Sequence, residues 1–199
     1  MFKNQSDQIK QLSDKQVLQS LYFTQFLLII ISIVMSIFLF KDIHDFLKVW
    51  EYKDNDFLLF GFITALIVII IDYIMMKLLP SHLLDDGGVN EKIFKNRNVL
   101  HIIFLTALIA FSEELLFRGI IQTHFGLLIA SLIFAILHFR YVTKIVLFIM
   151  VVAVSFLLGI VYELTNTIYS TMIAHFIIDF VFAIQIRRKF LKGVKRDNE

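Results

Sequence analysis

Long apolar runs separated by short polar segments dominate this chain of 199 residues. A helix needs about 20 mostly apolar residues to cross the hydrocarbon core of a bilayer. Six runs are candidates, at 21–40, 57–79, 99–122, 126–141, 144–162 and 167–186, and the fourth is short. The pattern therefore predicts an all-α, polytopic transmembrane helix bundle of about six spans.

The rest of the chain indicates one membrane domain with two polar ends. Residues 1–20 form a polar leader, residues 21–186 a single integral-membrane domain without repeats or linkers, and residues 187–199 a basic tail. Ser13 precedes Gln16 by three residues, a spacing typical of a helix capping box. The first apolar run is followed by Lys41 and Asp42 rather than by a small-residue cleavage site, so it is expected to be retained.

A short amphipathic segment follows the first span. Within residues 41–56, Ile43, Phe46, Leu47 and Trp50 recur at i, i+3, i+4 and i+7, with charged residues between them. This spacing is typical of a helix that lies in the membrane interface.

Composition narrows the protein class. Hydrophobic residues make up 58% of the chain and charged residues 18%, against about 25% charged in soluble domains. A nucleic-acid binder, a disordered chain and an ordinary cytosolic enzyme are therefore excluded, and the lipid bilayer is the expected surrounding. The chain has no cysteine, so a thiol nucleophile and a disulfide framework are excluded as well.

Lysine and arginine predict the orientation, because they concentrate in cytoplasmic loops. With six spans and a cytoplasmic amino terminus, the outer side holds only Lys41, Lys48, Lys53 and Arg118, and the carboxy terminus is also cytoplasmic. The abundance of Lys, Ile, Phe and Asn is typical of a low-GC bacterium, which places the protein in a bacterial plasma membrane.

Charged residues inside the predicted spans indicate function, because they are costly at bilayer depth. Glu114 and Arg118 are one helical turn apart and are expected to pair. Glu113 points about 100° away from Glu114, and its own neighbour one turn on is Phe117, so it has no counter-ion on its helix. Glu113 is therefore the candidate reactive carboxyl. Asp72, in the second span, stands apart, and its role stays open.

Two histidines complete the candidate site in the last four spans. Asp179 follows His175 by one turn and is expected to accept a ring N–H, which would fix the tautomer of His175. His138 follows Phe134 by one turn, so an aromatic wall is expected beside it. Counted from the outer turns, Glu113, His138 and His175 lie roughly 14–18 Å deep. The three side chains are therefore expected to share one site near mid-bilayer.

These residues resemble the three motifs of the CPBP family of intramembrane proteases, which comprises CAAX prenyl endopeptidases and bacteriocin-processing enzymes and is also called the Abi family. The motif residues are Glu113-Glu114-x-x-x-Arg118, Phe134-x-x-x-His138 and His175-x-x-x-Asp179. The resemblance covers about residues 99–183, and three motifs in order are far more specific than one.

The resemblance implies hydrolysis of a peptide bond within the membrane. By analogy with the family, Glu113 and His138 would activate the attacking water, and His175 with Asp179 would stabilise the oxyanion. Glu114 and Arg118, together with Phe134, would support the site. The expected substrate is a peptide or small membrane protein, with a bacteriocin leader or signalling peptide favoured over a prenylated CAAX protein.

The role of metal stays open at this stage. Glu113, His138 and His175 could supply a His2Glu zinc site with one open water position. If Glu113 bound zinc, the only other nearby base would be Glu114, which is committed to Arg118. The residues therefore favour a mechanism without a cofactor, with zinc as the alternative.

Two other functions fit parts of the sequence. A non-catalytic immunity or regulatory protein could keep the same fold, although such a protein has no need of an uncompensated Glu113. An ion-coupled transporter could use intramembrane carboxylates and histidines as relays. The chain lacks the inverted repeats typical of transporters, so this function ranks last. The sequence does not specify the oligomeric state.

Overall fold

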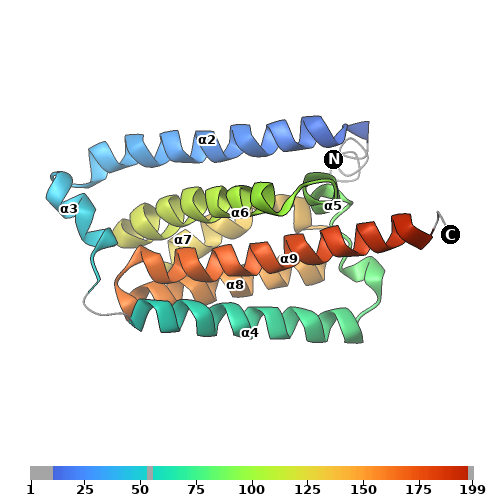
Figure 1. The fold of residues 1–199 in the computed structure, drawn as a ribbon. Helices are drawn as coiled ribbons and strands as arrows, with labels where there is room; N and C mark the ends of the chain where they lie inside the picture. Colours follow the sequence, from blue (N-terminus) through green and yellow to red (C-terminus); the bar gives the residue numbers. More distant parts are fainter. Residues whose placement is uncertain (1–10, 53–55, 197–199) are drawn as a thin grey trace.

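The computed structural model describes residues 11–52 and 56–196. The first ten residues of the predicted leader, Lys53 and the last three residues of the tail lie outside these ranges. Every element within them is helical (Figure 1). The elements are α2 (Asp14–Leu39), α3 (Ile43–Leu47), η1 (Lys48–Trp50), α4 (Asp56–Leu78), η2 (Ser81–Leu83), α5 (Val89–Phe94), α6 (Val99–Glu114), η3 (Leu115–Gln122), α7 (Thr123–Leu137), η4 (Phe139–Tyr141), α8 (Ile145–Thr165) and α9 (Ile168–Arg196).

The start of α2 follows from its capping residues. The Ser13 hydroxyl accepts from the backbone N–H of Gln16, and the Gln16 side chain accepts from the Ser13 N–H. The predicted capping box is therefore confirmed. The predicted interfacial segment is helical over α3 and η1, where Asp42 caps α3 through the Asp45 N–H.

The number of crossings depends on a reversal inside one long helical stretch. Five helical segments of the described chain are long and apolar enough to span a membrane, and one of them, Val99–Leu137, has 39 residues. Within it, Gly126 has φ 81° and ψ 168°, which is not helical. The rings of Phe117 and Phe134 are 4.8 Å apart, whereas a straight helix would separate them by about 25 Å. The chain turns back at Gly126, and the prediction of about six crossings is confirmed.

The helices form one bundle with α2 and α4 at opposite edges (Figure 1). α4 packs along α9, α6 lies between α2 and α9, and α7 packs against α8. The start of α2 and the end of α9 lie at the same end of the bundle, as an even number of crossings requires. α9 continues without a break into the basic segment that begins at Arg187.

Small and polar residues allow close helix contacts in this bundle. A Cβ on Gly61 of α4 would lie 2.9 Å from the Ser170 carbonyl oxygen of α9. Close backbone approach of this kind is how helices associate in lipid, where no hydrophobic driving force acts between them. The Ser112 hydroxyl of α6 donates to the Gln25 side-chain oxygen of α2 at 2.5 Å, and both residues are buried.

Candidate active site

A buried ion pair forms at the junction of α6 and η3. Arg118 Nη1 lies 3.0 Å from Glu114 Oε1, and the two side chains are 1% and 0% exposed. The predicted pairing of these residues is confirmed. Glu114 ends the α-helical part of this stretch, and η3, in which Arg118 lies, is π-helical. Segments of π-helix are rare and are frequent at functional sites.

Arg118 also connects two further helices. Its Nη2 donates to the Ser155 carbonyl oxygen at 2.9 Å and to the Ser155 hydroxyl at 3.2 Å, so the guanidinium reaches α8. The guanidinium carbon lies 5.1 Å from the centre of the Phe134 ring on α7. Sequence reasoning did not identify Ser155. The available signal was that it is the one hydroxyl in the apolar run from 145 to 161.

His175 of α9 contacts the carboxylate of this ion pair. Its Nδ1 lies 2.7 Å from Glu114 Oε1, and the imidazole is buried. The Asp179 carboxylate is farther away, at 3.6 Å from His175 Nε2, which is too long for a hydrogen bond. The nearest carboxylate to His175 is therefore Glu114 rather than the predicted Asp179. Glu114 supports both Arg118 and His175.

His138 lies at the end of α7 rather than within a helix. The prediction that its span continues to residue 141 is wrong, because α7 ends at Leu137 and η4 follows. His138 is the C-terminal cap residue of α7, with φ −88° and ψ 26°. The helix stops there because His138 leaves the α-helical conformation and the 3-10 turn η4 follows.

The orientation of His138 is fixed by Phe134. His138 Nδ1 lies 2.9 Å from the Phe134 carbonyl oxygen, and the two rings stack with centroids 4.4 Å apart. The predicted aromatic wall is therefore present. A carbonyl oxygen only accepts hydrogen bonds, so Nδ1 carries the proton in this contact. The Nε2 atom of a neutral His138 is then left with its lone pair.

Glu113 is half-buried and makes no hydrogen bond or ion pair with any residue in the described ranges. Its carboxyl group lies within electrostatic range of His175 and Asp179 on α9, and also of Glu114 and Arg118. His138 in turn lies within electrostatic range of His175. Glu113, Asp179 and His138 are thus each near His175, whereas no contact joins Glu113 to His138 within the described ranges.

Other titratable residues lie outside this group. Asp72 is half-buried on α4, and none of the described residues acts on its carboxyl group as a charged partner. His101 bonds to the Tyr22 hydroxyl at 2.8 Å. His124 contacts the carbonyl oxygens of Ile120 and Leu39. These two histidines have structural partners and are not candidates for catalysis.

The zinc alternative was tested against the donor geometry. In the part of the chain that the structure describes, no three His, Asp or Glu side chains are arranged so that they could hold one metal ion. His175 Nδ1 contacts Glu114 and His138 Nδ1 contacts a backbone carbonyl, an arrangement that leaves each Nε2 and is also common for zinc-binding histidines. The misfit to a preformed zinc centre is therefore one of position, because Glu113, His138 and His175 as placed do not converge on one metal ion.

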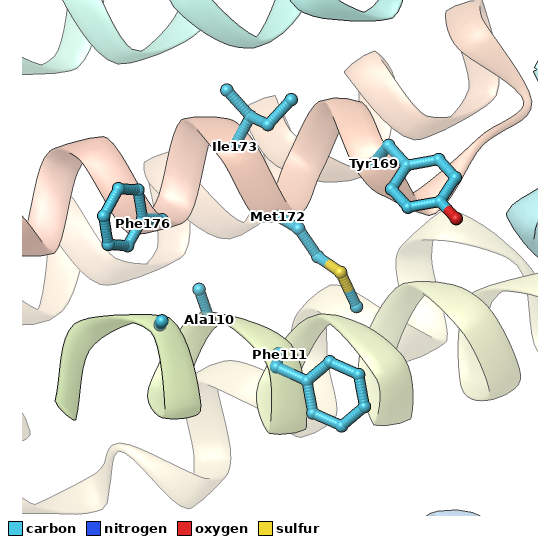
Figure 2. Close-up of a pocket in the computed structure, with 7 residues that line it drawn as sticks. Ala110, Phe111, Tyr169, Met172, Ile173 and Phe176 are labelled. Carbon is cyan, nitrogen blue, oxygen red and sulfur yellow. The ribbon is translucent and has the colours of Figure 1, made fainter. Parts of the chain in front are cut away.

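An apolar pocket of about 200 Å³ lies between α6 and α9 (Figure 2). Met172 extends from α9 toward Phe111 on α6, and Tyr169 and Phe176 line α9 on either side of Met172. The lining contains no carboxylate and no imidazole, so the pocket has no hydrolytic group of its own. Ala110 in its wall is one turn before Glu114.

Comparison with known proteins decides the family. The sequence model of a family described as type II CAAX prenyl endopeptidase Rce1-like matches residues 95–181, which include all seven residues of the three motifs. The uncharacterized protein YpbD of Bacillus subtilis (strain 168) is 55% identical over 174 residues, which are 87% of this chain and 92% of that protein. The chain belongs to the Rce1-like family. No solved structure matches the chain.

Membership of the Rce1-like family agrees with the resemblance identified from the motifs. The family is one of endopeptidases, and the five apolar helical segments indicate an integral membrane protein, as predicted. The matched region begins just before α6 and ends within α9, so it contains the buried ion pair and both histidines.

Proposed function

We propose that this protein is an intramembrane endopeptidase that hydrolyses a peptide bond of a peptide or small membrane protein. The favoured substrates are a bacteriocin leader or a signalling peptide rather than a prenylated CAAX protein. The observation that supports this proposal is the position of His175 on α9, which lies 3.6 Å from Asp179 and within electrostatic range of Glu113 on α6 and of His138 at the end of α7.

Glu113 and His138 activate the water in this proposal. Glu113 has no ion pair among the described residues, so its carboxylate is free to accept a proton. The Nδ1–H of His138 is held by the Phe134 carbonyl, which leaves Nε2 to accept a hydrogen bond from the same water. The water oxygen attacks the peptide carbonyl carbon while its proton moves to Glu113.

His175 stabilises the oxyanion that this attack creates. With Nδ1–H donating to Glu114, a proton on Nε2 lets the imidazolium donate to the tetrahedral oxygen. Asp179, at 3.6 Å from Nε2, balances the charge of the ring without occupying Nε2 by a hydrogen bond. Glu113 then passes its proton to the leaving amine as the C–N bond breaks, so proton and charge are balanced over the cycle.

Glu114, Arg118 and Phe134 position these groups. Glu114 holds His175, Arg118 holds Glu114, and Phe134 orients His138 through its carbonyl group and its ring. The surroundings are the lipid bilayer of a bacterial plasma membrane, with both termini in the cytoplasm.

The test compares membrane peptidomes of cells that carry the wild-type chain or Glu113→Gln, followed by cleavage of the identified peptide by purified protein. We expect the variant to lose cleavage while its thermal unfolding in detergent stays unchanged. The matched control is Glu51→Gln, because Glu51 is exposed beyond η1 and lies outside the site. Full activity of Glu113→Gln would contradict the proposal.

The same assay separates the two remaining alternatives. We expect activity to survive treatment of the purified protein with a strong chelator. Loss that zinc alone restores would show that a metal centre assembles on substrate binding. Normal biological activity of a Glu113→Gln, His175→Gln double variant would favour the non-catalytic immunity or regulatory function.

A further inference from the structure

A column of stacked groups runs from the buried ion pair to the surface of the protein. The Arg118 guanidinium lies over the Phe134 ring, and the His138 ring stacks on Phe134 at 4.4 Å. Tyr141 continues the column, parallel to His138 within 15° and 6.3 Å away. The Arg140 guanidinium lies 4.4 Å from the centre of the Tyr141 ring. His138 therefore lies between a buried arginine and an exposed one.

Arg140 has hydrogen-bond donors to spare. It is exposed, whereas Tyr141 beside it is buried. One guanidinium nitrogen donates to the Tyr141 hydroxyl, and no carboxylate in the described ranges lies within ion-pair distance of Arg140. A guanidinium has five N–H donors in a fixed fork that matches a carboxylate. Most of these donors remain free.

The charge of Arg140 acts on the candidate site. Arg140 lies within electrostatic range of both His138 and Asp179. Asp86 is the other acidic residue near the column, and its two oxygens accept hydrogen bonds from the backbone N–H groups of Gly88 and Asn90 at the start of α5. Asp86 is thus occupied as a turn-forming residue.

We propose that Arg140 is a specificity residue that binds a carboxylate group of the peptide substrate. This inference rests on the proposed endopeptidase function. The stacking on Tyr141 holds the guanidinium at a fixed position relative to His138. A substrate carboxylate bound there fixes which peptide bond reaches Glu113 and His138.

Three other basic residues at this end of the bundle are engaged in different contacts. Arg187 donates to the Arg97 carbonyl oxygen at 2.7 Å, and Arg97 donates to the Ile93 carbonyl oxygen. Lys95 pairs with Asp14 at 3.3 Å. Arg187 and Lys95 join separate elements, whereas Arg140 joins the site to the surface. Its position beside the candidate site assigns its free donors to the peptide substrate, and a lipid phosphate is the alternative that the vesicle composition distinguishes in the experiment below.

The experiment measures peptide binding and cleavage separately. The probe is a fluorescent peptide that spans the cleavage site found in the peptidome comparison, made with a free carboxyl end, with an amidated end, and with its acidic side chains replaced by amides. Binding is measured in a Glu113→Gln background by fluorescence anisotropy, with the protein in vesicles of neutral lipid. Cleavage is measured with Glu113 intact.

We expect Arg140→Gln to weaken binding of the carboxylate peptide about tenfold and to raise KM while kcat stays within about twofold. For one of the two neutralised peptides, binding should no longer differ between wild type and Arg140→Gln. If it is the amidated peptide, the bound carboxylate is the terminal one; if it is the peptide with amide side chains, the carboxylate belongs to a side chain. Arg140→Lys keeps the charge without the fork, and we expect it to restore part of the binding. This rescue also shows that the effect does not come from misfolding.

The matched control is Arg188→Gln, which removes an exposed charge about 14 Å along α9 from Asp179. Equal losses for Arg140→Gln and Arg188→Gln would overturn the inference, as would equal losses with all three peptides. A loss that appears only when the vesicles contain anionic lipid would also overturn it and would assign Arg140 to a headgroup. If binding of the peptide depends on Arg140 but the purified wild-type protein does not cleave it, the proposed endopeptidase function is wrong and the carboxylate contact of Arg140 still holds.

Discussion

Glu114 is the residue on which most of the site depends. It is fully buried and contacts both Arg118 and His175 through one oxygen, Oε1. Removing one member of a buried ion pair leaves the other charge uncompensated, which is far more costly than losing a surface pair. The stability of this region and the position of His175 are therefore linked.

We expect Glu114→Gln to destabilise the protein by about 3–5 kcal/mol, because Arg118 loses its counter-ion in a low-dielectric interior. Thermal unfolding in detergent measures this effect, with Glu51→Gln expected to stay within about 0.5 kcal/mol of wild type. Cleavage should fall as well, since His175 loses the negative charge beside its Nδ1–H. An unchanged unfolding midpoint would mean that the pair is not buried in the membrane protein.

Sequence reasoning identified the pairs within one helix better than the contacts between helices. Glu114 and Arg118 are four residues apart, so the pairing follows from helix geometry alone. The contact of Glu114 with His175 spans 61 residues and depends on how α6 packs against α9. Asp179 was chosen as the partner of His175 because it lies one turn away on the same helix, which favours proximity but does not guarantee the shorter distance.

At the scale of elements, Gly126 separates two crossings within one continuous helical stretch. Its φ of 81° and ψ of 168° lie in a region that glycine alone adopts without strain. A Cβ there would meet nothing within 4 Å, so any cost of a side chain comes from the backbone. The sequence predicted a turn near residues 124–126, because glycine and polar residues interrupt the apolar pattern there.

We expect Gly126→Ala to destabilise the protein by about 1–3 kcal/mol, through backbone strain alone. The matched control is Gly193→Ala in α9, where φ is ordinary and a Cβ again meets nothing within 4 Å. That change should stabilise the helix by up to about 1 kcal/mol. Chemical unfolding in mild detergent compares the two variants, and equal effects would contradict the role assigned to Gly126.

The end of α7 could not be located from the sequence. Residues 126–141 form a nearly continuous apolar run, so hydropathy gives no boundary at Leu137. The boundary arises where i→i−3 bonds replace the α-helical pattern, from His138 to Ala135 and from Tyr141 to His138, and where the His138 ring takes up the Phe134 carbonyl oxygen. A hydrogen bond of this kind depends on side-chain orientation, which periodicity does not report.

For the whole molecule, the start of α2 and the end of α9 lie at the same end of the bundle (Figure 1). The positive-inside rule predicts that this end faces the cytoplasm. Because the natural chain has no cysteine, single cysteines can report the orientation without interference.

We expect Lys48→Cys to react with a membrane-impermeant maleimide in intact cells and Arg188→Cys to react only after the cells are opened, since η1 and the end of α9 lie on opposite sides. The cysteine-free parent chain is the blank. The reverse labelling pattern would invert the orientation and would leave the fold unchanged.

The hydrogen bond between Glu114 and His175 ties α6 to α9. The apolar pocket lies between the same two helices. A bulky peptide that entered there by separating α6 from α9 would also break the contact between the His175 imidazole and the Glu114 carboxylate. Entry by that path would thus displace a histidine that the proposed hydrolysis requires.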